Sequence, residues 1–212
     1  MLSRGFTLME VLVTLVILLF GLLGIAGLMA RGQRAAFEAY QRQQALALAN
    51  DMAERIRVNQ SQATVYTAGA PPDTPVGTGG TTYNDLLHGS IVDCGSGSSC
   101  SAPNLAAYDL AMWEGLLQGY GERQATGDSL IGGIIGARGC IEETANTTGA
   151  CPAPPATTGT YFTRTLRVSV AWQGNEDTAV PATSTCGQNS YGEGDKKRRL
   201  VSLDVMVQQQ CP

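Results

Sequence analysis

The stretch from Val11 to Ala30 constrains this chain more than any other feature. It contains twenty residues without a charge, and only Thr14 and three glycines interrupt its apolar character. An α-helix of that length spans about 30 Å, which is the thickness of the hydrocarbon core of a bilayer. The sequence therefore predicts one membrane-spanning helix close to the N-terminal end of the chain.

The residues ahead of this run distinguish it from an ordinary export or anchor segment. A secretory signal peptide has an apolar core of about 7–15 residues and a small-x-small cleavage site. Here the core is longer, Leu28-Met29-Ala30 is a poor cleavage site, and a carboxylate, Glu10, lies at the front. A carboxylate at the bilayer centre costs about 2.5–3.5 kcal/mol. A plain anchor fits the length but leaves Glu10 and Gly5-Phe6 unexplained.

A basic leader, a cleavage dipeptide and a carboxylate at fixed spacing resemble the type III signal of the type IV pilin family. The residues that carry the resemblance are Gly5-Phe6-Thr7-Leu8-Met9-Glu10. The resemblance implies that residues 1–5 are a leader peptide and that prepilin peptidase cleaves between Gly5 and Phe6. It also implies that the same enzyme N-methylates Phe6.

Glu10 is predicted to be an assembly residue. In the family, a carboxylate at this position pairs with the N-terminal amine of a neighbouring subunit. Removing one partner of a buried ion pair costs about 3–5 kcal/mol. The alternative is local: an acid in the first turn of a helix interacts favourably with the helix dipole.

Three glycines, Gly21, Gly24 and Gly27, lie within the apolar run. Each costs roughly 1 kcal/mol relative to alanine in a helix interior. Small residues at regular spacing allow close approach of helices in a membrane. Major pilins commonly have a proline near the position of Gly27, which this chain lacks. We therefore expect the glycines to provide helix packing or loosening in a filament.

From Arg31 onward the pattern becomes amphipathic. One apolar stripe is formed at spacings of four, three and four residues by Ala45, Ala49, Met52 and Ile56, as on one face of a helix. We predict one helix that continues to Val58 or Asn59. Its membrane half covers residues 6–30, its amphipathic half residues 31–60, and one globular domain residues 61–212.

The globular region contains one further helix pattern and two strand patterns. Residues 104–120 have helical spacing, with Asn104 as the expected N-cap, Gly119 as the stop and Trp113 as a packing residue. Residues 163–172 and 200–207 alternate like half-buried strands. Two Pro- and Gly-rich stretches, 68–82 and 144–160, indicate loops. The expected fold is α+β: a type IV pilin fold with the long helix on a small antiparallel sheet and disulfide-closed loops.

Six cysteines lie in residues 61–212, and no cysteine precedes them. An even number in an exported domain indicates disulfides in an oxidising compartment. Pairing of nearest neighbours gives Cys94–Cys100, Cys140–Cys151 and Cys186–Cys211, although six cysteines allow about 15 pairings. The last pair would resemble the disulfide-bounded C-terminal loop of pilins. A zinc site is the alternative, but the single histidine, His88, and the spacings fit no zinc motif. No metal and no cofactor are expected.

Charge disfavours nucleic acid as a partner. Residues 61–212 contain eight basic and fourteen acidic residues, a net charge of −6, whereas nucleic-acid binding needs clustered Lys and Arg. The exception is Lys196-Lys197-Arg198-Arg199. Two hypotheses remain for this basic cluster: a patch for DNA or another partner, or a solvated strand edge that prevents aggregation.

Catalytic motifs are missing from the sequence. It contains no G-x-S-x-G elbow and no phosphate-binding loop, and residues 127–139 are glycine-rich without a G-x-G. We expect His88 to be a solvated side chain on a polar loop and Glu142-Glu143 to be exposed to solvent, rather than parts of an active site. We therefore expect a structural subunit with no catalytic residue.

The resemblance extends to a function. The 22.2 kDa mass and the long loops are similar to PilV-type minor pilins of the type IVa system. This implies a subunit in the bacterial inner membrane with a periplasmic domain, which contributes to priming of the pilus and hence to twitching motility or attachment. The implied partners are prepilin peptidase, other minor pilins, the major pilin and the inner-membrane assembly machinery. The alternatives are a type II secretion pseudopilin, a tip adhesin or a DNA-binding minor pilin.

Overall fold

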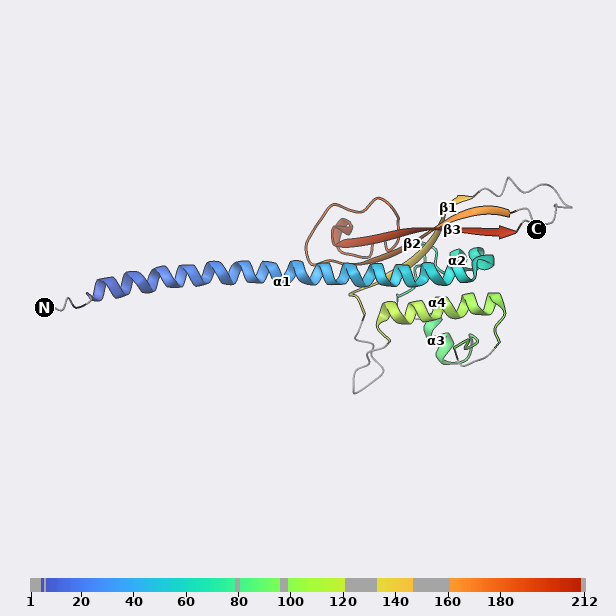
Figure 1. Cartoon of the computed structure of the whole chain (residues 1–212), viewed down its shortest axis with the longest axis horizontal. Coiled ribbons are helices and arrows are strands. Elements are labelled where there is room, and N and C mark those ends of the chain that lie inside the picture. The colour runs from blue at the N-terminus through green and yellow to red at the C-terminus, as the bar shows by residue number, and fades with distance from the viewer. Residues whose placement is uncertain are drawn as a thin grey trace. The chain divides into compact units, whose positions relative to one another are not determined.

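The computed structural model describes residues 5, 7–78, 81–95, 99–120, 133–146 and 161–210, and it confirms the expected α+β fold. The chain divides into two compact units, residues 1–40 and 41–212. The element order is α1 (Leu8–Val58), η1 (Gln60–Gln62), α2 (Ala63–Gly69), α3 (Thr81–Leu87), α4 (Ala102–Gln118), β1 (Arg138–Asn146), β2 (Tyr161–Gln173), η3 (Glu193–Asp195) and β3 (Arg198–Gln210) (Figure 1).

The first unit contains the N-terminal part of α1. Its large apolar side chains are exposed, from 41% at Val16 to 84% at Leu8. By length and composition this part of the helix can cross a membrane. Because exposed apolar surface of this extent is unfavourable in water, the segment needs lipid or another protein around it.

In the second unit, the C-terminal part of α1 lies between the sheet and α4 (Figure 1). The predicted stripe is buried, and Gln41 and Ala53 are buried with it. α4 contributes Trp113, whose indole N–H donates to the Leu48 carbonyl at 3.0 Å. Trp113 is fully buried, so its predicted packing role is confirmed. The α4 residues in this core are Ala106, Leu110, Trp113 and Leu117.

The sheet is an antiparallel meander in the order β1-β2-β3. β2 and β3 pair from Tyr161↔Gln210 to Gln173↔Arg198, which confirms the two predicted strands and extends them. The core-facing side chains alternate along both strands, and the most deeply buried are Leu166, Val168, Val170, Val205 and Val207. β1 was not anticipated from the sequence, because Ile141 is its one large apolar residue.

The start of α4 differs from the prediction. The N-cap is Ser101, not Asn104, and the Ser101 hydroxyl accepts the N–H of Asn104. Pro103 lies in the first turn, where a missing N–H costs nothing. Gly119 ends the helix in the left-handed conformation, with φ 78°, as predicted.

Buried polar groups tie the short helices to the long ones. The Asp109 carboxylate accepts from the Tyr66 hydroxyl at 2.6 Å and from Arg55 at 2.9 Å. The Glu114 carboxylate accepts the backbone N–H groups of Gly77 and Tyr83. These contacts hold α2 and α3 on α1 and α4, at the two ends of the stretch from residue 68 to residue 82 that the sequence predicted as a loop.

The disulfides correct two of the three predicted pairings. Cys94 is bonded to Cys100, as expected. Cys140 is bonded to Cys186, so the predicted Cys140–Cys151 and Cys186–Cys211 bonds were wrong; Cys151 and Cys211 lie outside the described residues. Cys140 pairs with Ser169 across the sheet, and the connection between β2 and β3 passes over this outer face. The Cys140–Cys186 bond was not predicted because it depends on β1, which places Cys140 on the outer face of the sheet.

Candidate functional site

The start of α1 is the first candidate site. The backbone N–H of Glu10 donates to both the carbonyl and the hydroxyl of Thr7, at 3.1 and 3.3 Å. Thr7 therefore caps the helix, and Thr7-x-x-Glu10 is the sequence pattern of a capping box. This signal was present in the sequence and was overlooked, because the peptidase motif occupies the same residues.

Glu10 lies in the first turn of α1, and its side chain is exposed. In the described part of the chain no ion pair involves it. The dipole of the helix favours an acid here. The local role and the assembly role are compatible, since the hydrogen bonds to Thr7 come from the backbone N–H of Glu10 and assembly would use its carboxylate.

The cleavage dipeptide is described in part. Gly5 is exposed, whereas Phe6, with its predicted N-methylation, lies outside the described residues. A peptidase needs an accessible peptide bond, and an exposed Gly5 outside the helix fits that need.

The three glycines of the apolar run are all helical and exposed. Within the described residues, a Cβ atom added at Gly21, Gly24 or Gly27 would meet no atom within 4 Å other than the backbone of its own helix. Packing within the subunit therefore gives no reason for glycine at these positions. Their predicted role in a filament stays a prediction.

The basic cluster Lys196–Arg199 is the second candidate site, and it lies where the β2–β3 connection, residues 174–197, returns to the sheet. Arg198 is 3% exposed, and its guanidinium donates to the carbonyl groups of Pro181, Ser184 and Cys186 at 2.8–3.0 Å. Arg199 donates to the Thr178 hydroxyl and to the Glu176 carbonyl. Both arginines are therefore held by the connection itself.

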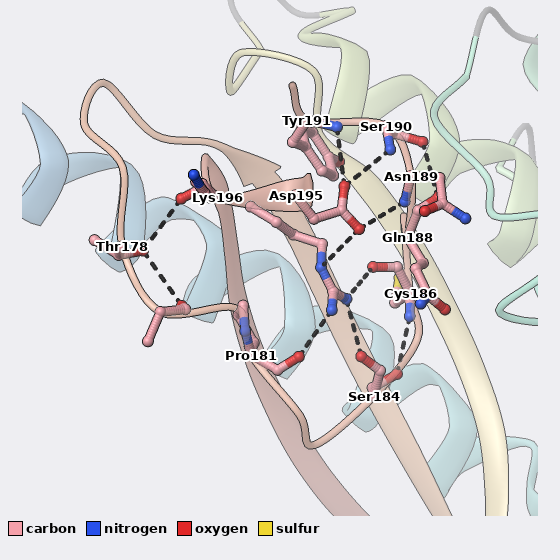
Figure 2. Close-up of polar contacts among 12 residues, drawn as sticks. Thr178, Pro181, Ser184, Cys186, Gln188, Asn189, Ser190, Tyr191, Asp195 and Lys196 are labelled. Carbon is pink, nitrogen blue, oxygen red and sulfur yellow. Dashed lines mark hydrogen bonds and ion pairs between the residues drawn. The ribbon is translucent and has the colours of Figure 1, made fainter. Parts of the chain in front are cut away.

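Asp195 organises the same connection from the other side. Figure 2 shows its carboxylate facing the backbone N–H groups of Asn189, Ser190 and Tyr191, at 2.6, 3.1 and 3.2 Å. The guanidinium of Arg198 lies 3.7 Å from the same carboxylate. Three N–H groups and one guanidinium satisfy this carboxylate, so its role is structural. Because Arg198 and Arg199 are held by the connection, the cations of the cluster that remain for solvent or a partner are Lys196 and Lys197.

A small second core lies under this connection on the outer face of the sheet. It contains the Cys140–Cys186 bond, Ala171 and Tyr191. The Tyr191 hydroxyl donates to the Gly136 carbonyl at 2.7 Å, and burial raises the pKa of this phenol above its usual value, more than the nearby Arg138 and Arg198 lower it. The outer face is therefore covered at one end by an ordered connection.

The residues considered for catalysis or metal binding are scattered. The His88 ring contacts the carbonyl of Asn84, in the preceding helix α3, at 2.7 Å. Glu143 pairs with Arg164 on the neighbouring strand. Within the described residues no group of three or more His, Cys, Asp or Glu side chains could hold a metal ion.

The chain has a peptidase motif at the start of an exposed apolar helix, and this helix leads into a disulfide-bonded α+β domain. These features define a membrane-anchored subunit of the prepilin type. Comparison with protein families agrees. Residues 1–26 match the prokaryotic N-terminal methylation motif, and residues 27–111 match the family described as type IV pilin Tt1218. Searches of the curated proteins and of the solved structures gave no match. The chain belongs to the type IV pilin family.

Family membership has direct consequences for this chain. The methylation motif implies processing by prepilin peptidase and assembly into pilus machinery. The apolar helix implies anchoring in a membrane. The family is structural, and its function is assembly rather than chemistry.

Proposed function

We propose that this chain is a minor pilin, most similar to the PilV type, that contributes to priming of type IV pilus assembly. The observation that carries the proposal is the helix α1, whose first part is apolar and exposed while its second part is buried in the domain. A subunit built in this way presents one half of a helix to lipid or to other subunits.

A minor rather than a major role is supported by the size of the chain and by its connections. The mass is 22.2 kDa, and the β2–β3 connection alone has its own small core and its own buried ion pair. The apolar run also lacks the proline that major pilins commonly have near the position of Gly27. These features support a specialised subunit present in few copies.

The proposed location follows from the disulfides and the helix. Cys94–Cys100 and Cys140–Cys186 require an oxidising compartment, which for a pilin is the periplasm. The chain would be anchored in the inner membrane by residues 6–30 and contact prepilin peptidase, other minor pilins, the major pilin and the assembly machinery. We propose no catalytic role, no cofactor and no nucleic-acid partner.

Glu10 is proposed to act at the moment of assembly. In a bundle of apolar helices, its carboxylate would neutralise the amine created by cleavage at Phe6 of a neighbouring subunit. The dielectric constant there is low, so an unpaired charge is costly. Gly21, Gly24 and Gly27 would allow close helix contact or local loosening in the same bundle.

A deletion strain tests the proposed function. We expect loss of surface pili and of twitching when the gene is removed, with recovery on complementation. Normal pili with lost attachment would instead indicate a tip adhesin. Normal pili with failed protein secretion would indicate a type II secretion pseudopilin. Either result would overturn the priming role.

Glu10→Ala tests the assembly step. The variant should be cleaved normally, but its incorporation into pili should fall on the order of 100-fold, the equivalent of about 3 kcal/mol for an unpaired buried charge. Glu54→Ala is the matched control, because it removes an exposed carboxylate from the other part of α1. Equal incorporation of the two variants would reduce Glu10 to a helix-start residue.

A further inference from the structure

Arg31 and Arg34 come directly after the apolar run. The functions described so far do not account for them. Between Val11 and Phe37 the only charged residues are Arg31 and Arg34. Both lie in α1 with exposed side chains, and in the described part of the chain neither takes part in an ion pair. They are three residues apart, so they lie on the same side of the helix.

Their distance from the run places both arginines among lipid headgroups. At 1.5 Å per residue, Arg31 lies about 1.5 Å and Arg34 about 6 Å beyond Ala30 along the helix. The headgroup layer on each side of a bilayer is about 5–8 Å thick. Arg42, the next arginine, lies about 18 Å beyond Ala30 and is outside this layer.

The local sequence leaves both guanidinium groups accessible. Gly32 and Ala35 flank them with little or no side chain, and among the described residues a Cβ atom at Gly32 would meet nothing within 4 Å beyond the backbone of its own helix. A guanidinium has planar donors that match phosphate oxygens in a bidentate manner. Long arginine side chains also reach along a helix toward headgroups while their stems remain in apolar surroundings.

Membrane orientation does not explain this pair. Lys and Arg residues favour the cytoplasmic flank of a membrane span, whereas Arg31 and Arg34 are on the flank that leads to the disulfide-bonded domain. Moving two positive charges across the membrane during export is unfavourable, so we expect the pair to have another role on that side.

We propose that Arg31 and Arg34 form a binding site for the phosphodiester groups of anionic phospholipids in the leaflet at the C-terminal end of the span. The proposal rests on the proposed insertion of residues 6–30 in the inner membrane. The arginine pair sets the depth of the helix before assembly, and its contacts with lipid are broken when the subunit leaves the membrane for the pilus.

Lipid retention tests this site on the full-length chain. The protein is reconstituted in nanodiscs with equal amounts of phosphatidylglycerol and phosphatidylcholine, and the lipids that remain bound are counted by native mass spectrometry. We expect phosphatidylglycerol to be enriched, and its ratio to phosphatidylcholine to fall about fivefold for each of Arg31→Gln and Arg34→Gln. The matched control Arg42→Gln removes the same charge outside the headgroup layer and should leave the ratio unchanged.

Four outcomes would overturn the proposal. One is that a double variant with both Arg31→Gln and Arg34→Gln retains as much phosphatidylglycerol as the wild type. Another is that Arg42→Gln lowers retention as strongly as Arg31→Gln or Arg34→Gln. A third is that inorganic phosphate displaces the lipid more than chloride does at the same ionic strength, which would indicate a site for free phosphate. The last is unchanged lipid retention with reduced incorporation into pili, which would assign the pair to carboxylates of a neighbouring subunit.

The result is separable from that for the proposed function. A chain that fails to enter nanodiscs contradicts membrane insertion itself, whereas a chain that enters without lipid preference contradicts the arginine site alone. If the chain shows the expected lipid preference but the deletion strain still makes normal pili, the priming role is contradicted and the arginine site is not.

Discussion

The two parts of α1 have the same backbone but depend on different surroundings. Up to Tyr40 the helix exposes its apolar side chains, and from Gln41 it buries a stripe that begins with Gln41 and Ala45. Within the first part, residues 11–30 are apolar on all sides, whereas the second part is apolar on one side only. A helix of the first kind requires lipid or a protein bundle, and one of the second kind requires a single partner surface.

This difference separates anchoring from folding. Substitutions in residues 8–40 should change insertion and assembly but leave the free energy of unfolding of the domain unchanged. Substitutions in the buried part and in the domain should have the opposite effect. The following variants test this separation, beginning with the largest expected effect.

Removal of the Cys140–Cys186 bond should have the largest effect on the domain. Its cysteines are 46 residues apart, against 6 for Cys94–Cys100. Chain entropy predicts a loss of about 4 kcal/mol for the first bond and about 2 kcal/mol for the second. The measurement is chemical unfolding of each double Cys→Ser variant. Equal losses would contradict an effect that depends on loop length, and unchanged membrane retention is expected in both.

Met52→Ala and Leu22→Ala compare the two parts of α1 directly. Met52 is 0% exposed and Leu22 is 64% exposed. Met52→Ala should lower the free energy of unfolding by about 3 kcal/mol, because it leaves a cavity in the core. Leu22→Ala should leave the unfolding of the domain unchanged in detergent. A similar loss for both variants would show that the first part of α1 belongs to the folded core.

Alkaline pH should weaken the domain through two tyrosines. Burial, with the hydrogen bond to Asp109, raises the pKa of Tyr66, and burial raises that of Tyr191. A raised pKa in the folded state means that stability is complete below the ordinary phenol pKa of about 10 and is lost as the pH rises above it. The free energy of unfolding should fall by up to about 1.4 kcal/mol per pH unit for each tyrosine.

The check on this pH dependence is a series of unfolding curves between pH 9 and pH 11. Tyr66→Phe and Tyr191→Phe should each reduce the slope above pH 10. Curves that are flat over this range would contradict the assignment.

Loss of a helix cap should have the smallest effect. Ser101→Ala removes the side-chain acceptor at the start of α4 and should lower the free energy of unfolding by about 1 kcal/mol. Thr7→Ala removes the corresponding group at the start of α1 and should not change domain unfolding. Equal losses in thermal unfolding experiments would contradict the separation of the two parts.

The elements that were predictable are those with long periodic patterns. α1, α4, β2 and β3 have enough residues for spacing to indicate both their type and their buried side. α2 and α3 have 7 residues each, too few for a helical period to be visible, and Tyr66 and Glu114 hold them through contacts distant in sequence. β1 has one large apolar residue, Ile141, and it forms because β2 offers a neighbouring edge.

Of the two candidate sites, the start of α1 was predictable from the sequence and the basic cluster was not. The cleavage motif, Glu10 and the apolar run are local in sequence, so a comparison of sequence patterns found them. The basic cluster was not interpretable in this way. Arg198 is buried because the returning connection places three carbonyl groups around its guanidinium, whereas Lys196, two residues earlier, is exposed.

The sequence by itself determined the membrane run, the peptidase motif and the secondary structure of the long elements, because each depends on residues that are neighbours along the chain. The tertiary structure alone decided that Cys186 bonds Cys140, that Arg198 is buried and that Asp109 joins Arg55 to Tyr66. These contacts join residues 12–54 positions apart, and only the folded sheet and helices bring them within bonding distance.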